Sequence, residues 1–339
     1  MLKKFLIILC AGMVFFSPAV LATKAPVNTH FANRPDVHKF ILTMVVRHSF
    51  NRSQLVNMFN TVKVRPRIIQ SVRVPLESRP WYVYQRVFIT PSNIRGGVIF
   101  WKRNASALAR AEKVYGVPAS IIVATIGVET KYGKDKGDYR VIDALANIAF
   151  SDSHRAAYFR QELEDFLLLS REQHLNPLEI RGSYAGAIGQ PQFMPSSYRH
   201  YAVSFSGNHR IDLTNNELDI IGSIANYYQK HGWQNSMPVA IPTVAETSHY
   251  RFMLHDKPSQ WLSQDELEEY GLFPSYKIPP RQKIRIIQLE GTSGNEYWIG
   301  LNNFEVIKRY NASNLYAMAV YQLSYYINTL RDKEKEQHG

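Results

Sequence analysis

Apolar residues recur every three or four positions through most of this chain, and this spacing places them on one face of an α-helix. The run "PASIIVATIGVETKYG", residues 118–133, is an apolar helix-like stretch that begins with a proline and stops near Gly133. The pattern therefore predicts a mainly α fold. Its expected helices are residues 36–49, 51–62, 96–116, 118–133, 141–150, 154–173, 216–232 and 313–330.

Two regions depart from the helical period. Residues 65–85 are rich in proline and arginine and predict an extended connection after the first two helices. From about Met237 to Phe304 the chain contains short β-type segments, which indicate a small insertion carried on a helical body. The charged residues 331–339 are expected to fray into solvent. The predicted strands are residues 237–244, 283–291 and 295–301, with the turn "GTSGNE" between the last two.

The N-terminus has the parts of a secretory signal peptide. Lys3 and Lys4 are followed by an apolar stretch, residues 5–16, and Ala22 is a small residue at a usable cleavage position. A permanent membrane helix is the weaker alternative, because the apolar stretch is short and a Ser-Pro pair follows it. We therefore expect a periplasmic mature chain that starts at Thr23.

Cys10 is the only cysteine of the chain and lies within the leader. It is a candidate for lipid attachment, but Leu9 before it is a poor fit for the small residue that lipoprotein cleavage requires, so anchoring is disfavoured. After cleavage no cysteine remains, which excludes disulfides and thiol chemistry from the mature chain.

Composition narrows the function classes. With 339 residues and 45% hydrophobic content, the chain can bury a sizeable core. Its net charge of +12 favours polyanionic partners such as an acidic cell wall. Nucleic acid is disfavoured as a partner, because the basic residues are scattered and the chain is expected to be exported. The motifs "HExxH" of metalloproteases and "GxSxG" of serine hydrolases are absent from the sequence.

Glu129 is the first candidate catalytic residue. It lies at the end of the apolar helix 118–133, where apolar neighbours and the negative end of the helix dipole both disfavour its ionisation. A carboxyl group whose pKa is raised in this way suits a general acid that works near neutral pH. The alternative is an ordinary helix-end glutamate that faces water.

A second candidate region is the segment 182–198, "GSYAGAIGQPQFMPSSY", which is dense in glycine and small residues. Small residues let a backbone approach a ligand closely, and aromatic rings stack on sugar faces. The alternative is a tight turn that leads into a helix at Pro195 and has no binding role. The polar groups and rings of the segment include Ser183, Gln192, Tyr184, Phe193 and Tyr198.

Four stretches of the sequence, in order along the chain, closely resemble the lytic murein transglycosylase B family, glycoside hydrolase family 103. They are "YGVPASIIVATIGVETKYGK", "GSYAGAIGQPQFMPSSY", "IGSIANYYQKHGW" and "GLNNFEVIKRYNASNLYAMAV". The resemblance is collinear from about Trp81 to the last helix. It implies a lysozyme-like helical core, without a cofactor, that cleaves the β-1,4 bond between N-acetylmuramic acid and N-acetylglucosamine in peptidoglycan.

The resemblance also implies roles for individual residues. The family's single catalytic glutamate corresponds to Glu129, and a supporting serine beside it corresponds to Ser183. Gln192 matches a substrate-contacting glutamine, and Arg155 matches an arginine of the glycan groove. The aromatic and amide wall of that groove corresponds to Tyr227, Tyr310, Asn311 and Tyr316, with Tyr84 as a weaker match.

The chain departs from the family pattern at two places. Several relatives have two consecutive arginines where this chain has His154 and Arg155, so one contact to the glycan is lost or becomes dependent on pH. Some relatives carry a calcium loop where this chain has residues 204–219, with Ser204, Asn208 and Arg210 in place of better oxygen ligands. Since an arginine opposes calcium binding, we expect no metal there.

A single acid implies a particular reaction. Glu129 would protonate the glycosidic oxygen and then deprotonate the C6 hydroxyl of muramic acid, which closes a 1,6-anhydro ring without consuming water. Ordinary glycosidases use two carboxylates, so a hydrolytic muramidase would need a second one, for which Asp152 and Asp165 are nearest in sequence. A non-catalytic peptidoglycan-binding protein is the alternative from a different class.

The expected organisation has five parts. They are a signal peptide (1–22), an N-terminal helical region (23–80), a lysozyme-like catalytic core (81–236), a β-rich insertion (237–304) and a C-terminal helix that returns to the core (305–339). The expected partner is the glycan strand of peptidoglycan, bound by a monomer. Cell-wall synthases or division proteins are further candidate partners that the sequence does not identify.

Overall fold

The computed structural model describes residues 31–73, 76–208, 210–246 and 261–338. The predicted signal peptide, its cleavage site and Cys10 lie outside these ranges. The described chain is mainly helical and carries one four-stranded and one two-stranded sheet. The predicted mainly α fold with a small β part is therefore confirmed.

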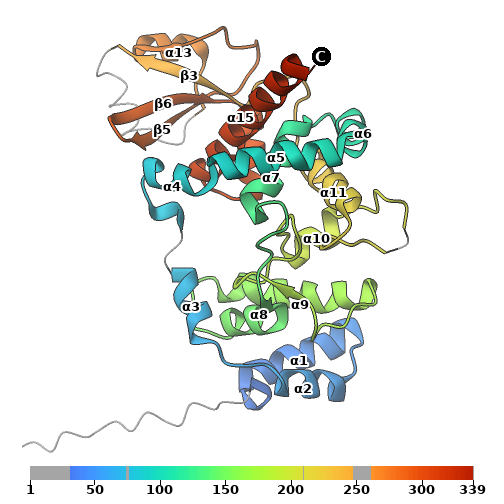
Figure 1. The fold of residues 1–339 in the computed structure, drawn as a ribbon. Coiled ribbons are helices and arrows are strands. Elements are labelled where there is room, and N and C mark those ends of the chain that lie inside the picture. Colours follow the sequence, from blue (N-terminus) through green and yellow to red (C-terminus); the bar gives the residue numbers. More distant parts are fainter. Residues whose placement is uncertain (1–30, 74–75, 209, 247–260, 339) are drawn as a thin grey trace, which may run out of the picture.

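The helices gather in two groups, and the larger sheet lies at the far end of one of them (Figure 1). The first group contains the N-terminal helices and two helices from the middle of the chain. At its centre the rings of Phe40, Phe59 and Phe150 meet edge to face, with centroids 5.8 to 6.2 Å apart. The group consists of α1 (Pro35–His48), α2 (Arg52–Asn60), α3 (Pro66–Arg73), α8 (Val141–Ala149) and α9 (Ala156–Glu172).

A buried carboxylate and a buried amide on α8 attach the N-terminal helices to this group. Asp143 accepts a hydrogen bond from the Lys63 N–H at 3.1 Å and pairs with Arg140 at 2.6 Å. Asn147 accepts from the Arg65 N–H at 2.7 Å and donates to the Lys63 carbonyl at 2.8 Å. Because unpaired polar groups are costly to bury, these bonds fix the chain that leads into α3.

The second group surrounds α7 (Ala119–Thr130), in which ten of the twelve residues are buried. Since nearly every side of this helix is covered, its sequence is apolar throughout rather than amphipathic. The C-terminal helix packs closely here, and a Cβ atom on Gly97 would lie only 2.5 Å from Ile327. The other members are α4 (Trp81–Phe88), α5 (Pro91–Arg103), α6 (Ala105–Tyr115), α11 (Glu217–Lys230), α14 (Asn302–Tyr310) and α15 (Asn314–His338).

The larger sheet is antiparallel, with strand order β4-β3-β6-β5. It has its own small apolar core, which includes Ile241, Leu267 and Ile299. Trp298 meets Tyr321 of α15 edge to face at 6.2 Å, and this contact attaches the sheet to the helices. The three predicted strands are confirmed. The elements are β3 (Ala240–Ala245), α13 (Gln264–Glu269), β4 (Leu272–Pro274), β5 (Arg285–Gly291) and β6 (Gly294–Gly300).

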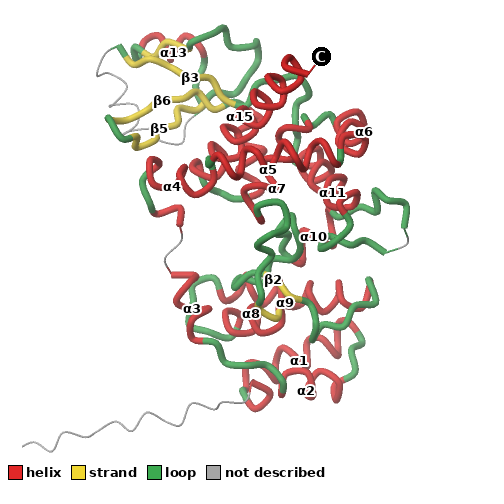
Figure 2. The backbone as a smooth tube through the Cα atoms, viewed as in Figure 1, coloured by secondary structure: helices red, strands yellow, loops and turns green. Residues whose placement is uncertain are grey.

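Loops concentrate between the two helical groups (Figure 2). The chain passes through this region after α7 and again before α10 (Pro195–Tyr201). Two short strands, β1 (Tyr139–Arg140) and β2 (Arg181–Gly182), pair there in antiparallel fashion. Irregular backbone from distant parts of the sequence thus meets at the C-terminal end of α7.

The predicted extended connection over residues 65–85 is wrong. The structure has α3, a short 3₁₀ turn η2 (Leu76–Ser78) and the start of α4 in this stretch. Pro66 begins α3 and Pro80 precedes α4, positions at which proline's fixed backbone angle favours a helix start. The prolines in this segment therefore begin helices rather than prevent them.

Two other helix predictions need correction. The predicted single helix over residues 96–116 is broken at Asn104, whose side chain donates to the Phe100 carbonyl at 3.1 Å and ends α5. The C-terminal residues 331–338 do not fray, because α15 continues through them. Lys102 pairs with Glu334 at 2.7 Å and stabilises this last part of the helix.

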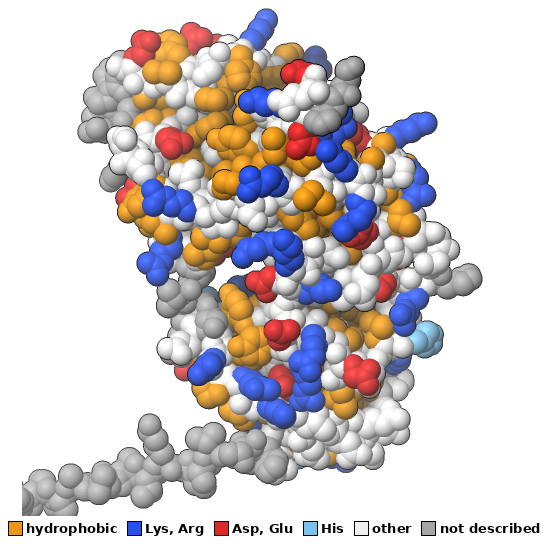
Figure 3. Space-filling view, in the orientation of Figure 1, with side chains coloured by type: hydrophobic (Ala, Val, Ile, Leu, Met, Phe, Trp, Pro, Cys, Tyr) orange, Lys and Arg blue, Asp and Glu red, His pale blue; other side chains and the backbone are white. Residues whose placement is uncertain are grey.

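The described residues contain no single helix that is long and apolar enough to cross a membrane. The pair α6 and α7 meets the length and composition criteria together, but the two helices are bent by 113° and α7 is buried in the core. On the face shown in Figure 3, lysine and arginine side chains are spread among acidic and apolar ones and form no continuous basic stripe.

Candidate active site

Glu129 lies in the last turn of α7. The helix ends at Thr130, slightly before the predicted end, because Lys131 and Tyr132 adopt left-handed backbone angles with φ of 50° and 62°. Their N–H groups bond back to the carbonyls of Gly127 and Ile126, which closes the helix end. The Tyr132 hydroxyl also donates to the Asn93 carbonyl at 2.8 Å. This closure fixes the backbone that carries Glu129.

The carboxyl group of Glu129 is in an environment that favours its neutral form. Its pKa is raised from 4.5 to about 7 as the net result of three effects: burial raises it most, a hydrogen bond from Tyr316 lowers it, and the charge of Glu77 raises it. The Tyr316 hydroxyl donates to Oε1 of Glu129 at 2.6 Å. A carboxyl group with this pKa can donate a proton near neutral pH and take it back in the same turnover. The raised pKa and the bond from Tyr316 argue against the alternative of a water-facing helix-end glutamate.

Aromatic rings form one wall beside Glu129. Tyr316 and Tyr310 stack with centroids 6.2 Å apart and planes inclined by 13°. Tyr310 in turn contacts Tyr227 at 4.8 Å and Phe193 at 5.7 Å. The structure therefore brings together residues from α15, α14, α11 and the glycine-rich segment, as the family resemblance predicts for this wall.

The hydroxyl groups of this wall are committed to protein acceptors. Tyr310 donates to the Pro191 carbonyl and Tyr227 to the Arg309 carbonyl, both at 2.6 Å. Burial raises the pKa of Tyr310 and of Tyr316 well above the ordinary value, so both remain neutral donors. Tyr316 therefore contributes a hydrogen bond to Glu129 as well as a ring to the wall.

The glycine-rich segment forms a tight turn. A Cβ atom on Gly182 would lie 2.1 Å from the Ala187 carbonyl oxygen, so only glycine fits there. The Ser183 hydroxyl oxygen accepts hydrogen bonds from the N–H groups of Ala185 and Ala187 at 3.2 and 3.1 Å. Among the described contacts Ser183 therefore supports the turn as a hydrogen-bond acceptor.

Gln192 holds this segment against the loop that follows α7. Its backbone is left-handed, with φ of 50°. Its side-chain NH₂ group donates to the carbonyls of Gly189 at 2.8 Å and Lys136 at 3.2 Å. The amide nitrogen thus has a scaffolding role that the sequence did not predict.

Arg155 lies at the start of α9, on the other helical group. Its guanidinium group is 5.0 Å from the centre of the Tyr158 ring, and both side chains are exposed. The charges of Arg155 and of Glu77 both act on Tyr184, in opposite directions, which puts Tyr184 within reach of each. Tyr158 is a candidate groove residue that the sequence analysis missed.

Glu77 is a second carboxylate at the site, and it also was not predicted. Its Oε1 accepts a hydrogen bond from the Asn311 side chain at 3.1 Å. The charges of Glu77 and Glu129 both raise the pKa of Tyr84, a fully buried residue that stacks on Trp81. Because Tyr84 is buried, the structure gives it no open face toward a substrate, and its role in the groove stays a prediction.

Asp165 is not a free second carboxylate. It is buried and forms an ion pair with Arg199, which also binds Glu172 at 2.8 Å. A carboxylate neutralised in this way is a poor nucleophile or base. Of the two sequence-based candidates for a hydrolytic second acid, Asp165 is thus committed to an ion pair.

The loop 204–219 is closed by hydrogen bonds within the protein. Asp219 is fully buried and accepts from the N–H groups of Ser206 at 2.8 Å and Asp212 at 3.1 Å. It also accepts from the side chain of Asn216 at 3.1 Å. N–H donors therefore occupy the carboxylate oxygens that a calcium ion would need.

The other residues of the loop also do not fit calcium. The Ser204 hydroxyl donates to the Asn208 carbonyl, and Arg210 adds a positive charge. Among the residues that the structure describes, no cluster of three or more His, Cys, Asp or Glu side chains could hold a metal ion. We derive no metal-dependent step for this site.

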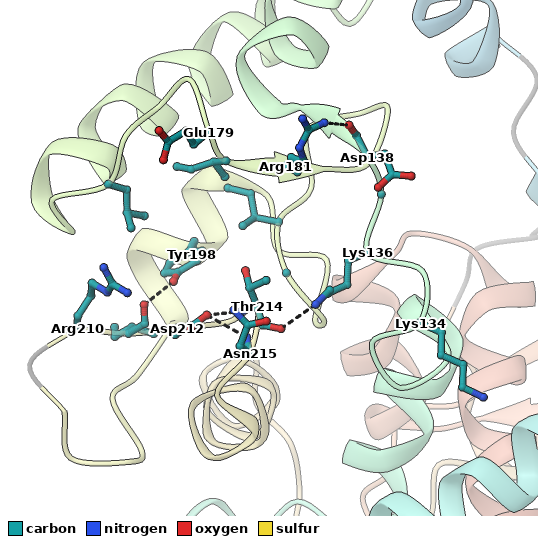
Figure 4. Close-up of a pocket in the computed structure, with 16 residues that line it drawn as sticks. Lys134, Lys136, Asp138, Glu179, Arg181, Tyr198, Arg210, Asp212, Thr214 and Asn215 are labelled. Carbon is teal, nitrogen blue, oxygen red and sulfur yellow. Dashed lines mark hydrogen bonds between the residues drawn. The ribbon is translucent and has the colours of Figure 1, made fainter.

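A separate cavity of about 490 Å³ lies beside this loop, and its lining includes neither Glu129 nor Tyr316 (Figure 4). Two of its four basic side chains donate to backbone carbonyls: Lys136 donates to Thr214 at 3.3 Å, and Arg181 donates to Asp138 at 2.7 Å. These two bonds join loops that are distant in sequence and give both side chains a scaffolding role.

Comparison with known proteins identifies the family. The sequence model of the transglycosylase SLT domain matches residues 32–325. The chain belongs to the transglycosylase SLT family. Among characterised relatives, membrane-bound lytic murein transglycosylase B of Escherichia coli K12 is 42% identical over 303 residues, which is 86% of this chain and 82% of that protein.

Solved structures of family members share the fold. Soluble lytic transglycosylase SltB1 from Pseudomonas aeruginosa is 42% identical and superposes with a TM-score of 0.81, covering 88% of this chain and 100% of that one. Lytic transglycosylase Slt35 from E. coli, solved in complex with calcium, is 40% identical with a TM-score of 0.81, covering 89% and 95%. The predicted resemblance and the lysozyme-like fold class are thereby confirmed.

Proposed function

We propose that this chain is a lytic transglycosylase, a lyase that cleaves the β-1,4 bond between N-acetylmuramic acid and N-acetylglucosamine in peptidoglycan and leaves 1,6-anhydro ends. The observation that carries this proposal is the carboxyl group of Glu129, which has a pKa of about 7 and accepts a hydrogen bond from Tyr316. Membership of the transglycosylase SLT family supports it. The likeness to lytic murein transglycosylase B supports it further.

In the first step, neutral Glu129 donates its proton to the glycosidic oxygen, and the bond from that oxygen to C1 of muramic acid breaks. The departing N-acetylglucosamine keeps the proton as its new hydroxyl group. Positive charge develops at C1, and the N-acetyl oxygen of the muramic acid stabilises it. The newly formed carboxylate of Glu129 keeps the hydrogen bond from Tyr316, which stabilises the charged form.

In the second step, the Glu129 carboxylate removes the proton from the C6 hydroxyl, and O6 attacks C1 to close the anhydro ring. The proton returns to Glu129, so the enzyme is restored and no water is consumed. A pKa near 7 suits both steps, because the same group acts as acid and then as base.

The groove around this acid is proposed to contain the residues that the resemblance assigns. Tyr310 and Tyr227 would offer rings, Asn311 and Gln192 amide groups, and Arg155 a cation for anionic parts of the substrate. Ser183 is proposed to donate its free O–H toward the substrate, and Tyr84 to line the groove.

Product analysis separates this proposal from its two rivals. Purified protein is incubated with peptidoglycan, and the released muropeptides are measured by mass spectrometry beside those of a hydrolytic muramidase. Anhydro products, lighter by one water and without a reducing end, are expected from wild type and not from Glu129→Gln. Reducing ends would identify a hydrolase, and no release by a folded protein would identify a binding protein. Glu290→Gln, an exposed change on β5, serves as the control variant.

Because peptidoglycan lies in the cell envelope, we propose that the chain acts there as a monomer, after export and cleavage behind Ala22. The division into an N-terminal helical region, a catalytic core over residues 81–236, a β-rich insertion and a returning helix is proposed as the functional organisation. No nucleic acid is proposed as a partner.

A further inference from the structure

We infer that Glu77, on the short turn η2 between the two helical groups, is a positioning residue of the active site that holds the Asn311 amide and keeps Glu129 protonated. This inference rests on the proposed function, in which Glu129 is the acid. It adds to that function a second carboxylate whose role is electrostatic rather than nucleophilic.

The contacts place Glu77 at one end of a continuous path to the catalytic group. Asn311, 234 positions away in sequence, donates from its side chain to Glu77 at 3.1 Å. Asn311 directly follows Tyr310 at the end of α14, and Tyr310 stacks on Tyr316 at 6.2 Å. Tyr316 completes the path with its hydrogen bond to Glu129. Glu77, from the first half of the chain, thus holds the Asn311 side chain beside the aromatic wall.

Electrostatic effects place the charge of Glu77 close to the same point. This charge raises the pKa of Glu129, of Tyr84 on α4 and of Tyr184 in the glycine-rich segment. The pKa values of three groups on three different elements therefore depend on the charge of Glu77. This places the carboxylate of Glu77 within electrostatic range of all three groups.

The other groups that face Glu129 are neutral at physiological pH. They are tyrosines whose pKa values burial raises, and the charge of Glu129 contributes to that rise in each. These tyrosines are Tyr84 from α4, Tyr228 from α11, Tyr310 from α14 and Tyr316 from α15. Among the described groups that act on the pKa of Glu129, Glu77 is the one that carries a negative charge.

The chemical consequence follows from like-charge repulsion. Two carboxylates close together resist double ionisation, so a charge on Glu77 keeps the proton on Glu129. The same charge opposes the hydrogen bond from Tyr316, which favours ionisation. Glu77 and Tyr316 therefore act on the acid in opposite directions, and the proton affinity of Glu129 reflects both.

Two substitutions separate the charge of Glu77 from its hydrogen bond. Glu77→Gln removes the charge but keeps an oxygen that accepts from Asn311, whereas Glu77→Ala removes both. Glu290→Gln removes an exposed carboxylate on β5 and is the matched control. Thermal unfolding of each variant shows that the fold is intact, and Glu77→Gln alone suffices for the test if Glu77→Ala does not fold.

The first readout needs no activity. Carbon-13 NMR of glutamate-labelled protein follows the ionisation of Glu129, whose signal is assigned by its loss in Glu129→Gln. The titration midpoint is expected to fall in Glu77→Gln and to stay near 7 in Glu290→Gln. An unchanged midpoint in Glu77→Gln would overturn the inference and show that Glu77 only anchors η2.

The second readout is turnover of peptidoglycan as a function of pH. The alkaline limb of the profile is expected to move to lower pH in Glu77→Gln, with about a tenfold loss of rate above neutrality for each pH unit that the midpoint falls. Glu77→Ala is expected to show the same movement and a higher KM, because the Asn311 amide is released. If wild type forms no anhydro product, the proposed function fails, while the NMR titration still decides the role of Glu77.

Discussion

Glu129→Gln is expected to stabilise the fold above neutral pH although it abolishes activity. The wild-type carboxyl group has a pKa of 4.5 in the unfolded chain and about 7 in the folded protein. Because the folded value is the higher one, the neutral carboxyl group favours folding below about pH 4.5, and this contribution is lost as the pH rises through about 7. Above that pH, wild type must hold a buried carboxylate.

The size of the effect follows from the two pKa values. Each pKa unit corresponds to about 1.4 kcal/mol, so ionisation of Glu129 lowers the free energy of unfolding by roughly 3 kcal/mol between about pH 4 and pH 8.5. Glutamine cannot ionise, and its side-chain oxygen can still accept the hydrogen bond from Tyr316. The variant should therefore gain roughly 3 kcal/mol relative to wild type over this range.

Urea unfolding followed by circular dichroism at a series of pH values measures this difference. All other titrating groups are shared by the two proteins, so the variant-minus-wild-type free energy isolates Glu129. Glu290→Gln is expected to show no such dependence, because its carboxylate is exposed. A difference that is flat from pH 4 to about pH 8.5 would refute the raised pKa and, with it, the general-acid argument.

Three further outcomes are expected. Tyr316→Phe removes the donor that lowers the pKa of Glu129, so the alkaline limb of the rate profile should move to higher pH, and an unmoved limb would contradict the hydrogen bond. A chelator should change neither activity nor melting temperature, because Asp219 closes its loop with N–H donors; a drop in melting temperature that calcium restores would contradict this. Exported protein should begin at Thr23 and carry no lipid by intact mass, whereas a diacylated Cys10 would show that the leader was misread.

Helices and strands whose residue patterns are local could be predicted from the sequence. The apolar run of α7 and the alternation of β5 and β6 depend on neighbours within a few positions, so their patterns are visible without tertiary information. The helix α3 is different, because it forms where Asp143 and Asn147 of α8 hold the preceding backbone. These contacts are not visible in the sequence, where the prolines predicted an extended segment. In the structure, Pro66 begins the helix.

The site shows the same division. Glu129 could be predicted because its helix end and apolar neighbours are local features. The contact from Tyr316, 187 positions away, came only through family resemblance, and even then its hydrogen bond was not foreseen. Glu77 had no signal at all, since a single glutamate in a segment rich in proline and arginine has no recognisable pattern. Its partner, Asn311, lies on the opposite end of the chain.

The aromatic wall beside Glu129 links the strength of the acid to the identity of the product. Burial by Tyr310, Tyr316 and their neighbours raises the pKa of the acid. In the proposed mechanism, water and the sugar's own hydroxyl would compete for the positively charged carbon, and a wall that excludes bulk water would favour the hydroxyl. A substitution that lets solvent in would therefore lower the pKa of Glu129, leave less of its protonated form near neutral pH and divert part of each turnover to hydrolysis. The fraction of reducing ends among the products would then measure how much water reaches the pocket.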